Sequence, residues 1–245
     1  MKMQQLLLIG LLIAVSLLGC ARAEPALTFA RCELLVESDV AEVVFRKLMA
    51  NLNINVDIRA FPPARATTEN VSARVAGEIE RIYSYGVKYP TLVRVTPSYY
   101  SQTSVVYAQK SRQLNISSKE DLKKYRVGVV RGVKHTDDLV EGLPTLVKAI
   151  NTKNLIKMLL ADRVDVIITT GIDGDVNLAR LGATNDIKAV ATLAKLELFI
   201  YLNQSSSAYR KRISKEIVRM RSSGELASLI AKTEARVSAV RVKEL

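Results

Sequence analysis

The sequence predicts an α/β protein of two lobes, each with a mainly parallel sheet flanked by helices. Strand-like and helix-like segments alternate along the chain after the N-terminal leader, and such alternation is typical of parallel sheets. A polar stretch over residues 109–117 separates one such series from a second that begins at Ser118. With 245 residues, the chain is long enough for one large domain or two lobes even after loss of a leader.

Residues 1–23 have the pattern of an export signal. Lys2 precedes an apolar run from Leu6 to Val15 that continues to Leu18, and small residues follow. This run falls short of the roughly 20 residues that a membrane-spanning helix needs. Two cleavage sites fit equally well: residues 17–20 resemble a lipobox, which would leave Cys20 lipidated, and Ala21-Arg22-Ala23 would remove Cys20. We expect a periplasmic protein, attached to a membrane only if Cys20 carries lipid.

The first lobe begins with a strand and a helix. Leu34-Leu35-Val36 predicts a short strand, and Ser38-Asp39 predicts the cap of a helix whose apolar positions 40, 43, 44 and 48 follow the helical period. Residues 54–58 alternate as a second strand, and Pro62-Pro63 interrupts it. A helix is expected over 64–76, ending at Gly77, with a third strand over 79–82.

A strand predicted over 99–108 precedes the polar segment, and the second lobe then repeats the alternation. Ser118 with Asp121 predicts a capped short helix before a buried strand at 127–130. A glycine turn over 131–136, a helix capped by Thr152 and a strand over 163–168 follow. Two further strands, at 187–191 and 196–202, lead back to the first lobe, and two helices joined near Gly224 end the chain.

The charge is strongly basic, and its excess lies near the C-terminus. The formal net charge is +12. Ten Lys or Arg residues stand against four Glu residues over 208–245. Tyr209 is the only aromatic residue in that stretch, so an array for stacking nucleic-acid bases is missing. We expect a solvated helix face and no nucleic-acid partner, because a charge run alone does not define a site.

The sequence offers little for catalysis, metals or disulfides. His135 is the only histidine, and Cys32 has no second cysteine with which to form an intrachain disulfide once Cys20 is acylated or removed. Residues 173–177 resemble the start of a calcium loop but lack its glycine and final glutamate. Glu78 and Glu80 sit two apart on a strand, which suggests an exposed edge pair rather than the flanking carboxylates of a glycosidase. We therefore expect no enzyme, no cofactor and no metal.

A ligand site is expected where strands end at a cleft between the lobes. The turn from Arg131 to Thr136 offers free amides and cationic side chains, which favour an anion. Arg81 follows a strand and is placed to clamp a carboxylate or phosphate; an ion pair with Glu78 or Glu80 is the alternative. The expected ligand-binding residues are Arg81, Tyr83, Tyr85, Tyr99, Arg131, Gly132, His135, Thr136, Thr169 and Thr170.

In their order, several segments resemble the bacterial extracellular solute-binding proteins of family 3, which deliver small solutes to ABC transporters. They are Arg65 with residues 75–78, Pro97-Ser98-Tyr99-Tyr100, Asp121-Leu122 with 127–129, residues 159–165, and Ser223-Gly224-Glu225-Leu226. The resemblance covers almost the whole chain after the leader. It implies the type II two-lobed periplasmic-binding-protein-like fold, with residues 27–108 and 197–245 in lobe 1, 112–193 in lobe 2, and two crossing strands as a hinge.

The resemblance also implies a function and its limits. It implies a monomer that binds a small-molecule solute and has an ABC transporter permease as its partner. Amino-acid binders of this family hold the α-carboxylate with an arginine, whose position falls here near Pro90, and the α-amine with an aspartate, whose position falls near Thr170. An anionic solute other than a standard α-amino acid is therefore expected. The alternative is an envelope sensor or protein-interaction module on the same fold.

Overall fold

The fold is an α/β arrangement around one long, curled sheet. The computed structural model describes residues 26–33 and 35–243. The expected signal peptide over 1–23 and Cys20 lie outside the described residues. The strands are β1 (Leu27–Cys32), β2 (Val56–Phe61), β3 (Gly77–Ile82), β4 (Val93–Arg94), β5 (Tyr100–Gln109), β6 (Val127–Val130), β7 (Leu146–Ala149), β8 (Val166–Thr170) and β9 (Ile187–Leu202).

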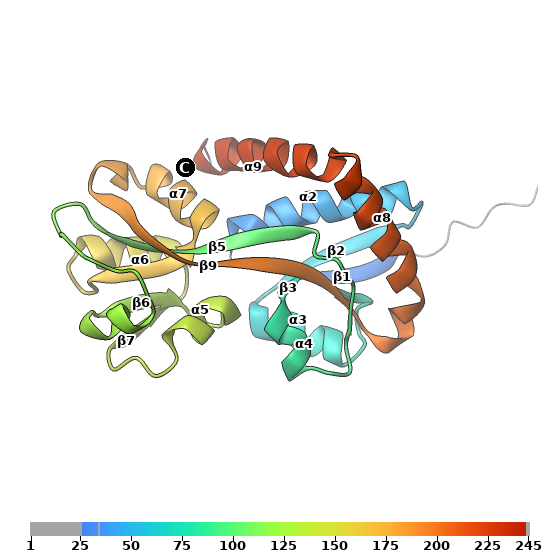
Figure 1. The fold of residues 1–245 in the computed structure, drawn as a ribbon, viewed down its shortest axis with the longest axis horizontal. Coiled ribbons are helices and arrows are strands. Elements are labelled where there is room, and N and C mark those ends of the chain that lie inside the picture. The colour runs from blue at the N-terminus through green and yellow to red at the C-terminus, as the bar shows by residue number, and fades with distance from the viewer. Residues whose placement is uncertain (1–25, 34, 244–245) are drawn as a thin grey trace, which may run out of the picture.

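The helices flank this sheet on both sides (Figure 1). They are α2 (Val36–Asn51), α3 (Pro63–Val71), α4 (Tyr83–Lys88), α5 (Lys134–Val140), α6 (Thr152–Leu160), α7 (Gly171–Arg180), α8 (Arg210–Ser222) and α9 (Glu225–Lys243). Short 3₁₀ turns lie at Glu120–Lys124, Ala183–Asn185 and Gln204–Tyr209. In the described part of the chain, none of these helices has the length and apolar character to cross a membrane.

Two long strands connect the halves of the sheet. The strand order is β2-β1-β3-β9-β5-β8-β6-β7, with β4 also paired to β9. Strands β1, β2 and β3 pair in parallel, and so do β6, β7 and β8. Strand β9 runs antiparallel to β3, β4 and β5, and β5 runs antiparallel to β8. Strands β5 and β9 pair from Tyr100↔Leu198 to Gln109↔Ile187, and they span the space between the halves (Figure 1). This arrangement provides the two crossing strands that the sequence predicted.

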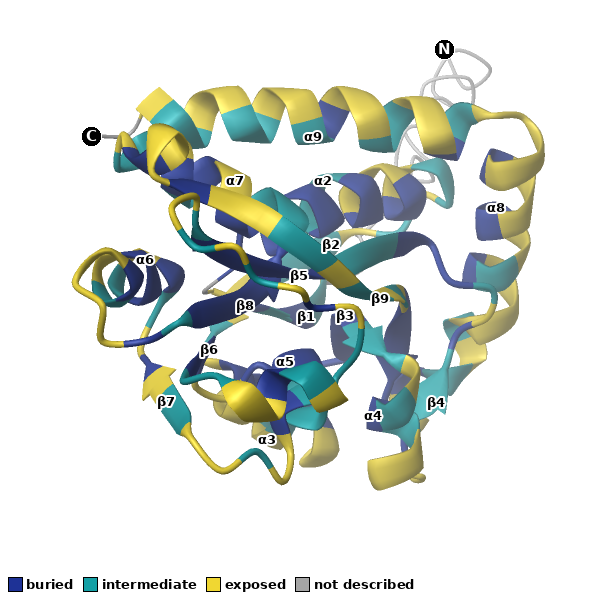
Figure 2. Ribbon diagram, turned by 60° about the vertical axis from the view of Figure 1, so that its left-hand side comes forward, coloured by how far each residue is buried: buried dark blue, intermediate teal, exposed yellow. Residues whose placement is uncertain are grey.

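Each half has its own apolar core. In the first half, Phe29, Phe45 and Leu48 are fully buried together with residues of α8 and α9. In the second half, one cluster around Leu155 and Ile167 lies on one face of the sheet, and another around Val127 lies on the opposite face. Strand β8 is buried along its whole length, whereas α9 is mostly exposed or half-buried (Figure 2). The burial of these side chains supplies most of the driving force that folds each half.

The structure shifts several boundaries that the sequence predicted. The first strand is 27–32, and α2 begins at Val36, so Leu35 and Val36 do not form the strand expected there, and Leu34 lies outside the described residues. Helix α3 ends at Val71, because Ala73 has a φ of 54°, which an α-helix does not accommodate. The strands expected at 187–191 and 196–202 form one strand of 16 residues, since pairing with β5 continues through local register shifts.

The acidic pair of β3 is also corrected. Strand β3 lies between β1 and β9 rather than at an edge of the sheet. The relative exposures of Glu78 and Glu80 are only 2% and 9%. The register of β3 against β9 shifts between Glu78 and Arg81, so simple alternation does not describe this strand. Two carboxyl groups are thereby buried where the sequence predicted an exposed pair.

Candidate functional site

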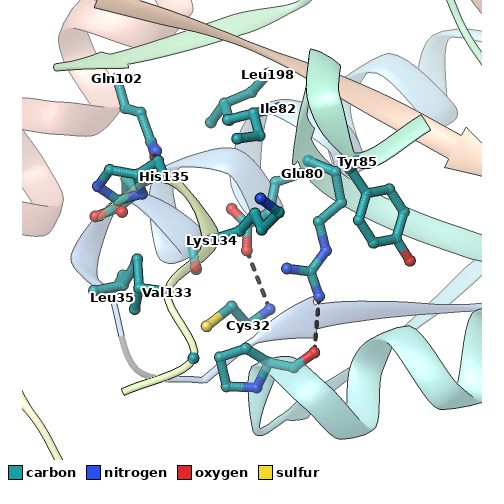
Figure 3. Close-up of a pocket in the computed structure, with 15 residues that line it drawn as sticks. Cys32, Leu35, Glu80, Ile82, Tyr85, Gln102, Val133, Lys134, His135 and Leu198 are labelled. Carbon is teal, nitrogen blue, oxygen red and sulfur yellow. Dashed lines mark hydrogen bonds between the residues drawn. The ribbon is translucent and has the colours of Figure 1, made fainter. Parts of the chain in front are cut away.

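A small cavity lies where the two halves of the molecule meet. The first half contributes the end of β1, the start of α2 and the end of β3, while the second half contributes the turn before α5 and the start of that helix. The cavity volume is about 50 Å³, which is room for a few water molecules. The lining residues are Cys32, Leu35, Glu37, Ser38, Pro63, Glu80, Arg81, Ile82, Tyr85, Gln102, Gly132, Val133, Lys134, His135 and Leu198 (Figure 3).

Glu80 supplies one buried carboxyl group to this cavity. The backbone N–H of Cys32 donates to its Oε1 at 3.1 Å (Figure 3). Its Oε2 has no hydrogen-bond partner within the described residues. Burial raises the pKa of Glu80 to about 7, although the hydroxyl of Ser38, the Cys32 amide and the nearby charge of Arg81 oppose this change. At neutral pH this carboxyl group is therefore poised between its charged and neutral forms.

Glu37 supplies a second buried carboxyl group, from the first turn of α2. The hydroxyl of Thr170 donates to its Oε2 at 2.8 Å, which links the two halves of the molecule. Its Oε1 has no hydrogen-bond partner in the described part of the chain. Burial, and then the charge of Asp173, raise the pKa of Glu37 well above its usual value. A nearby cation would favour its charged form.

Asp173 lies behind Glu37 and is held by hydroxyl groups. Thr152 and Thr169 donate to its Oδ2, the latter at 2.9 Å, and the Val36 amide donates to Oδ1 at 3.4 Å. Burial raises the pKa of this carboxyl group as well. Its carboxylate oxygens are occupied by these bonds. Asp173 is thus an acidic group behind Glu37 that does not line the cavity.

His135 brings a ring nitrogen to the opposite wall. Its Nδ1 lies 3.0 Å from Nε2 of Gln102, and the two side chains are adjacent in Figure 3. Its Nε2 has no partner among the residues that the structure describes. Burial lowers the pKa of His135 to about 4, with the charge of Asp138 opposing the change. The ring is therefore neutral at pH 7.

Arg81 lines the cavity but is already engaged in an ion pair. Its Nε donates to Oε2 of Glu78 at 2.5 Å, and its Nη2 donates to the carbonyl of Pro63 at 2.9 Å. Its guanidinium group also lies over the ring of Tyr85 at 4.9 Å, and the hydroxyl of Tyr85 donates to Glu78. The alternative of an ion pair with Glu78 is confirmed, in a buried rather than a surface position.

The expected ligand-binding residues fall into two groups. Arg81, Tyr85, Gly132 and His135 line the cavity. The other six do not line it. Tyr83 is 57% exposed and Arg131 is exposed, while Tyr99 is buried and its hydroxyl donates to the carbonyl of Ile79. The hydroxyl of Thr136 donates to the carbonyl of Val133, that of Thr169 donates to Asp173, and that of Thr170 donates to Glu37. Helix α5 is only seven residues long, and the Thr136 amide is used within its first turn.

Sequence reasoning missed Glu37, Ser38 and Gln102, and it placed Glu80 at the surface. A signal for Glu37 was present. It lies three, four and seven positions before Val40, Ala41 and Val44, which are fully buried, so it occupies the apolar face of α2. A carboxyl group on a buried helix face requires a partner or a functional reason.

Comparisons with known proteins agree on the fold. No family model matches the sequence. An uncharacterised protein of Shewanella oneidensis is 23% identical over 194 residues, which cover 75% of this chain and 72% of that protein. The amino acid ABC transporter substrate-binding protein AbpA of Streptococcus pneumoniae, solved with L-arginine, is 16% identical with a TM-score of 0.70, covering 89% of this chain and 97% of AbpA.

This chain has the two-lobed periplasmic-binding-protein-like fold. The GluR0 ligand-binding core, solved with L-glutamate, superposes with a TM-score of 0.73 at 14% identity, over 86% of this chain and 98% of that core. A histidine kinase sensor domain with similarity to periplasmic binding proteins superposes with a TM-score of 0.71 at 16% identity. The match covers 86% of this chain and 96% of that domain. Transport proteins and sensors therefore share this fold.

Proposed function

We propose that this chain is an exported solute-binding protein that captures a small solute between its lobes and catalyses no reaction. The cavity at the junction of the lobes carries the proposal, because buried polar atoms that line it have no partner within the described chain. In this proposal, closure follows bending of β5 and β9, with 27–108 and 197–245 moving against 112–193. In this proposal the transport role is delivery of the solute to an ABC transporter permease, which the similarity to AbpA supports.

A sensor role is the second candidate. It is supported by the similarity to the histidine kinase sensor domain and to the VFT2 domain of Bordetella pertussis BvgS, which superposes with a TM-score of 0.69 at 14% identity. Solute capture between the lobes is common to both roles in this proposal. Solute uptake by a strain that lacks the gene separates them, since only a transport protein is required for uptake.

The expected charge of the solute needs revision. An anion was expected because Arg81 and Arg131 were placed at the cleft. Arg81 is committed to Glu78, and Arg131 is exposed outside the cavity. The acidic residues Glu37 and Glu80 line the cavity, and neither is paired with Arg81 or Arg131 in an ion pair of the described chain. These contacts support a solute of the opposite charge.

Thermal unfolding in the presence of solutes tests the proposed function. The mature protein is heated with amines, amino acids, organic acids and sugars. A bound solute raises the unfolding temperature, because it adds about 2.7 kcal/mol of stability at a hundredfold excess over its Kd. A chain that none of these classes stabilises would not be a solute-binding protein.

A further inference from the structure

Three buried polar atoms of one cavity lack hydrogen-bond partners in the described chain. They are Oε1 of Glu37, Oε2 of Glu80 and Nε2 of His135. Their residues are 2%, 9% and 5% exposed, and all three line the same cavity. Buried polar groups normally find partners, because leaving them unpaired costs the full desolvation of the group. A ligand that fits the cavity would satisfy them together.

The cationic side chains around the cavity are already paired with other residues. Two nitrogens of Arg81 bind Glu78, Pro63 and Thr67, while Nζ of Lys134 pairs with Asp138. Arg31, whose charge reaches Glu80, pairs with Asp39 and Glu42. Among the residues that the structure describes, the carboxyl groups of Glu37 and Glu80 form no such ion pair. Because Asp173 adds a third acid behind them, the cavity favours positive charge in its ligand.

The histidine adds a second requirement. The Gln102 amide nitrogen faces Nδ1 of His135, so it donates to that atom. A neutral ring that accepts at Nδ1 carries its proton on Nε2. Nε2 therefore donates into the cavity. It calls for an acceptor oxygen on the ligand, close to the group that the two carboxyl groups would bind.

We propose that the ligand is a small protonated amine that also carries a hydroxyl or carbonyl oxygen. Its ammonium group donates to Oε1 of Glu37 and Oε2 of Glu80, and its oxygen accepts from Nε2 of His135. Charge-assisted hydrogen bonds of this kind are the strong ones in a buried site. This inference rests on the proposed solute-binding function and adds the chemical class of the solute. Both carboxyl groups belong to the first lobe and His135 to the second, so such a ligand would bridge them.

Matched probes test the class. Ethanolamine and 5-aminopentan-1-ol are titrated by calorimetry at about pH 8, where Glu80 is largely ionised. Glycolate and 5-hydroxypentanoate serve as anions of the same lengths, and 1,2-ethanediol and 1,5-pentanediol as neutral analogues. Choline keeps the charge and the hydroxyl group but has no N–H to donate. We expect at least one amino alcohol to bind, and to bind at least tenfold more tightly than its analogues and choline.

Variants tie the binding to these residues. Glu80→Gln is expected to weaken amine binding at least tenfold, and Glu37→Gln is a second variant in case the first does not fold. Glu141→Gln, at an exposed position on the second lobe, is the control and should bind as the unaltered protein does. Binding that survives both carboxyl variants unchanged would overturn the assignment.

The outcomes separate the two proposals. If anionic or neutral probes bind and the amines do not, the amine inference fails while the solute-binding function stands. If no probe binds and no solute class raises the unfolding temperature, both fail. If the amines bind but choline binds equally well, the ammonium does not donate as proposed, and the inference is overturned.

Discussion

Glu80 and His135 line the same cavity, and their pKa values are shifted in opposite directions from the ordinary values. Burial raises the pKa of Glu80 from 4.5 to about 7 and lowers that of His135 from 6.5 to about 4. Both shifts favour the neutral form, because each charge would lose its hydration. Near pH 6 both side chains therefore carry little charge.

These shifts predict how stability depends on pH. Between about pH 4.5 and 7, folded Glu80 keeps a proton that the unfolded chain has lost, so its contribution falls as pH rises, by about 1.4 kcal/mol per pH unit. His135 acts in the opposite sense between about pH 4 and 6.5, because only the unfolded chain holds its proton there. The two contributions offset each other where their windows overlap.

Urea unfolding of Glu80→Gln and His135→Gln between about pH 5 and 6.5 measures these contributions. Glu80→Gln should make the slope of unfolding free energy against pH more positive by about 1.4 kcal/mol per unit, and His135→Gln should make it more negative by as much. Other groups facing Glu80 (Cys32, Glu37, Arg81, Tyr99 and Tyr100) remain in both variants. If both variants had the same slope as the Glu141→Gln control, Glu80 and His135 would have ordinary pKa values in the folded protein.

At the scale of elements, α7 depends on a glycine that faces β5. A Cβ built on Gly174 would lie 2.4 Å from the ring of Tyr107. The Tyr107 hydroxyl donates to the carbonyl of Gly171 and to Asp175, each at 3.0 Å, so the ring cannot easily move away. This close approach brings α7, with Asp173 and the Thr170 cap, against the strand that crosses between the lobes.

Gly174→Ala is therefore expected to destabilise the protein, although alanine favours helices. Overpacking of this kind costs about 1–3 kcal/mol. Urea unfolding measures the loss, and combining Gly174→Ala with Tyr107→Leu should restore part of it by removing the ring. If Gly174→Ala proved as stable as the unaltered chain, α7 and β5 would be packed less closely than the structure indicates.

At the scale of the whole molecule, hydrogen bonds join the lobes around the cavity. Thr170 donates to Glu37, the Val36 amide donates to Asp173, and the Ser84 hydroxyl donates to Asp138 at 3.3 Å. Helix α9 also packs against both α2 and α7, and it lies along the outer face of both (Figure 1). These contacts hold the two halves of the molecule together.

Spin labels test the proposed hinge. Cysteines replace the exposed residues Arg59 and Lys188, one in each lobe, and their separation is measured by pulsed electron resonance with and without a solute that raises the unfolding temperature. The separation should become shorter or more narrowly distributed with solute, because binding shifts the population toward closure. A pair at Arg59 and Lys211, both in the first lobe, should not change. Identical distributions for the first pair would argue against hinge closure.

The sequence by itself determined the order of elements. The alternation of strands and helices, the buried strand at 127–130 and the break at Gly224, with its φ of 74°, all follow from local patterns. It also determined that Arg81 would have either a ligand or an acidic neighbour. These features could be predicted because each depends on residues close together in the chain.

Only the tertiary structure decided what the cavity contains. Glu37, Glu80 and His135 come from three separate segments, and their meeting depends on how β3, α2 and α5 are placed by the long pairing of β5 with β9. The register shift in β3 decided that Glu78 would hold Arg81 while Glu80 reached the cavity. A one-residue change of register reverses which face a side chain occupies, so the sign of charge in the cavity was set by packing between distant segments.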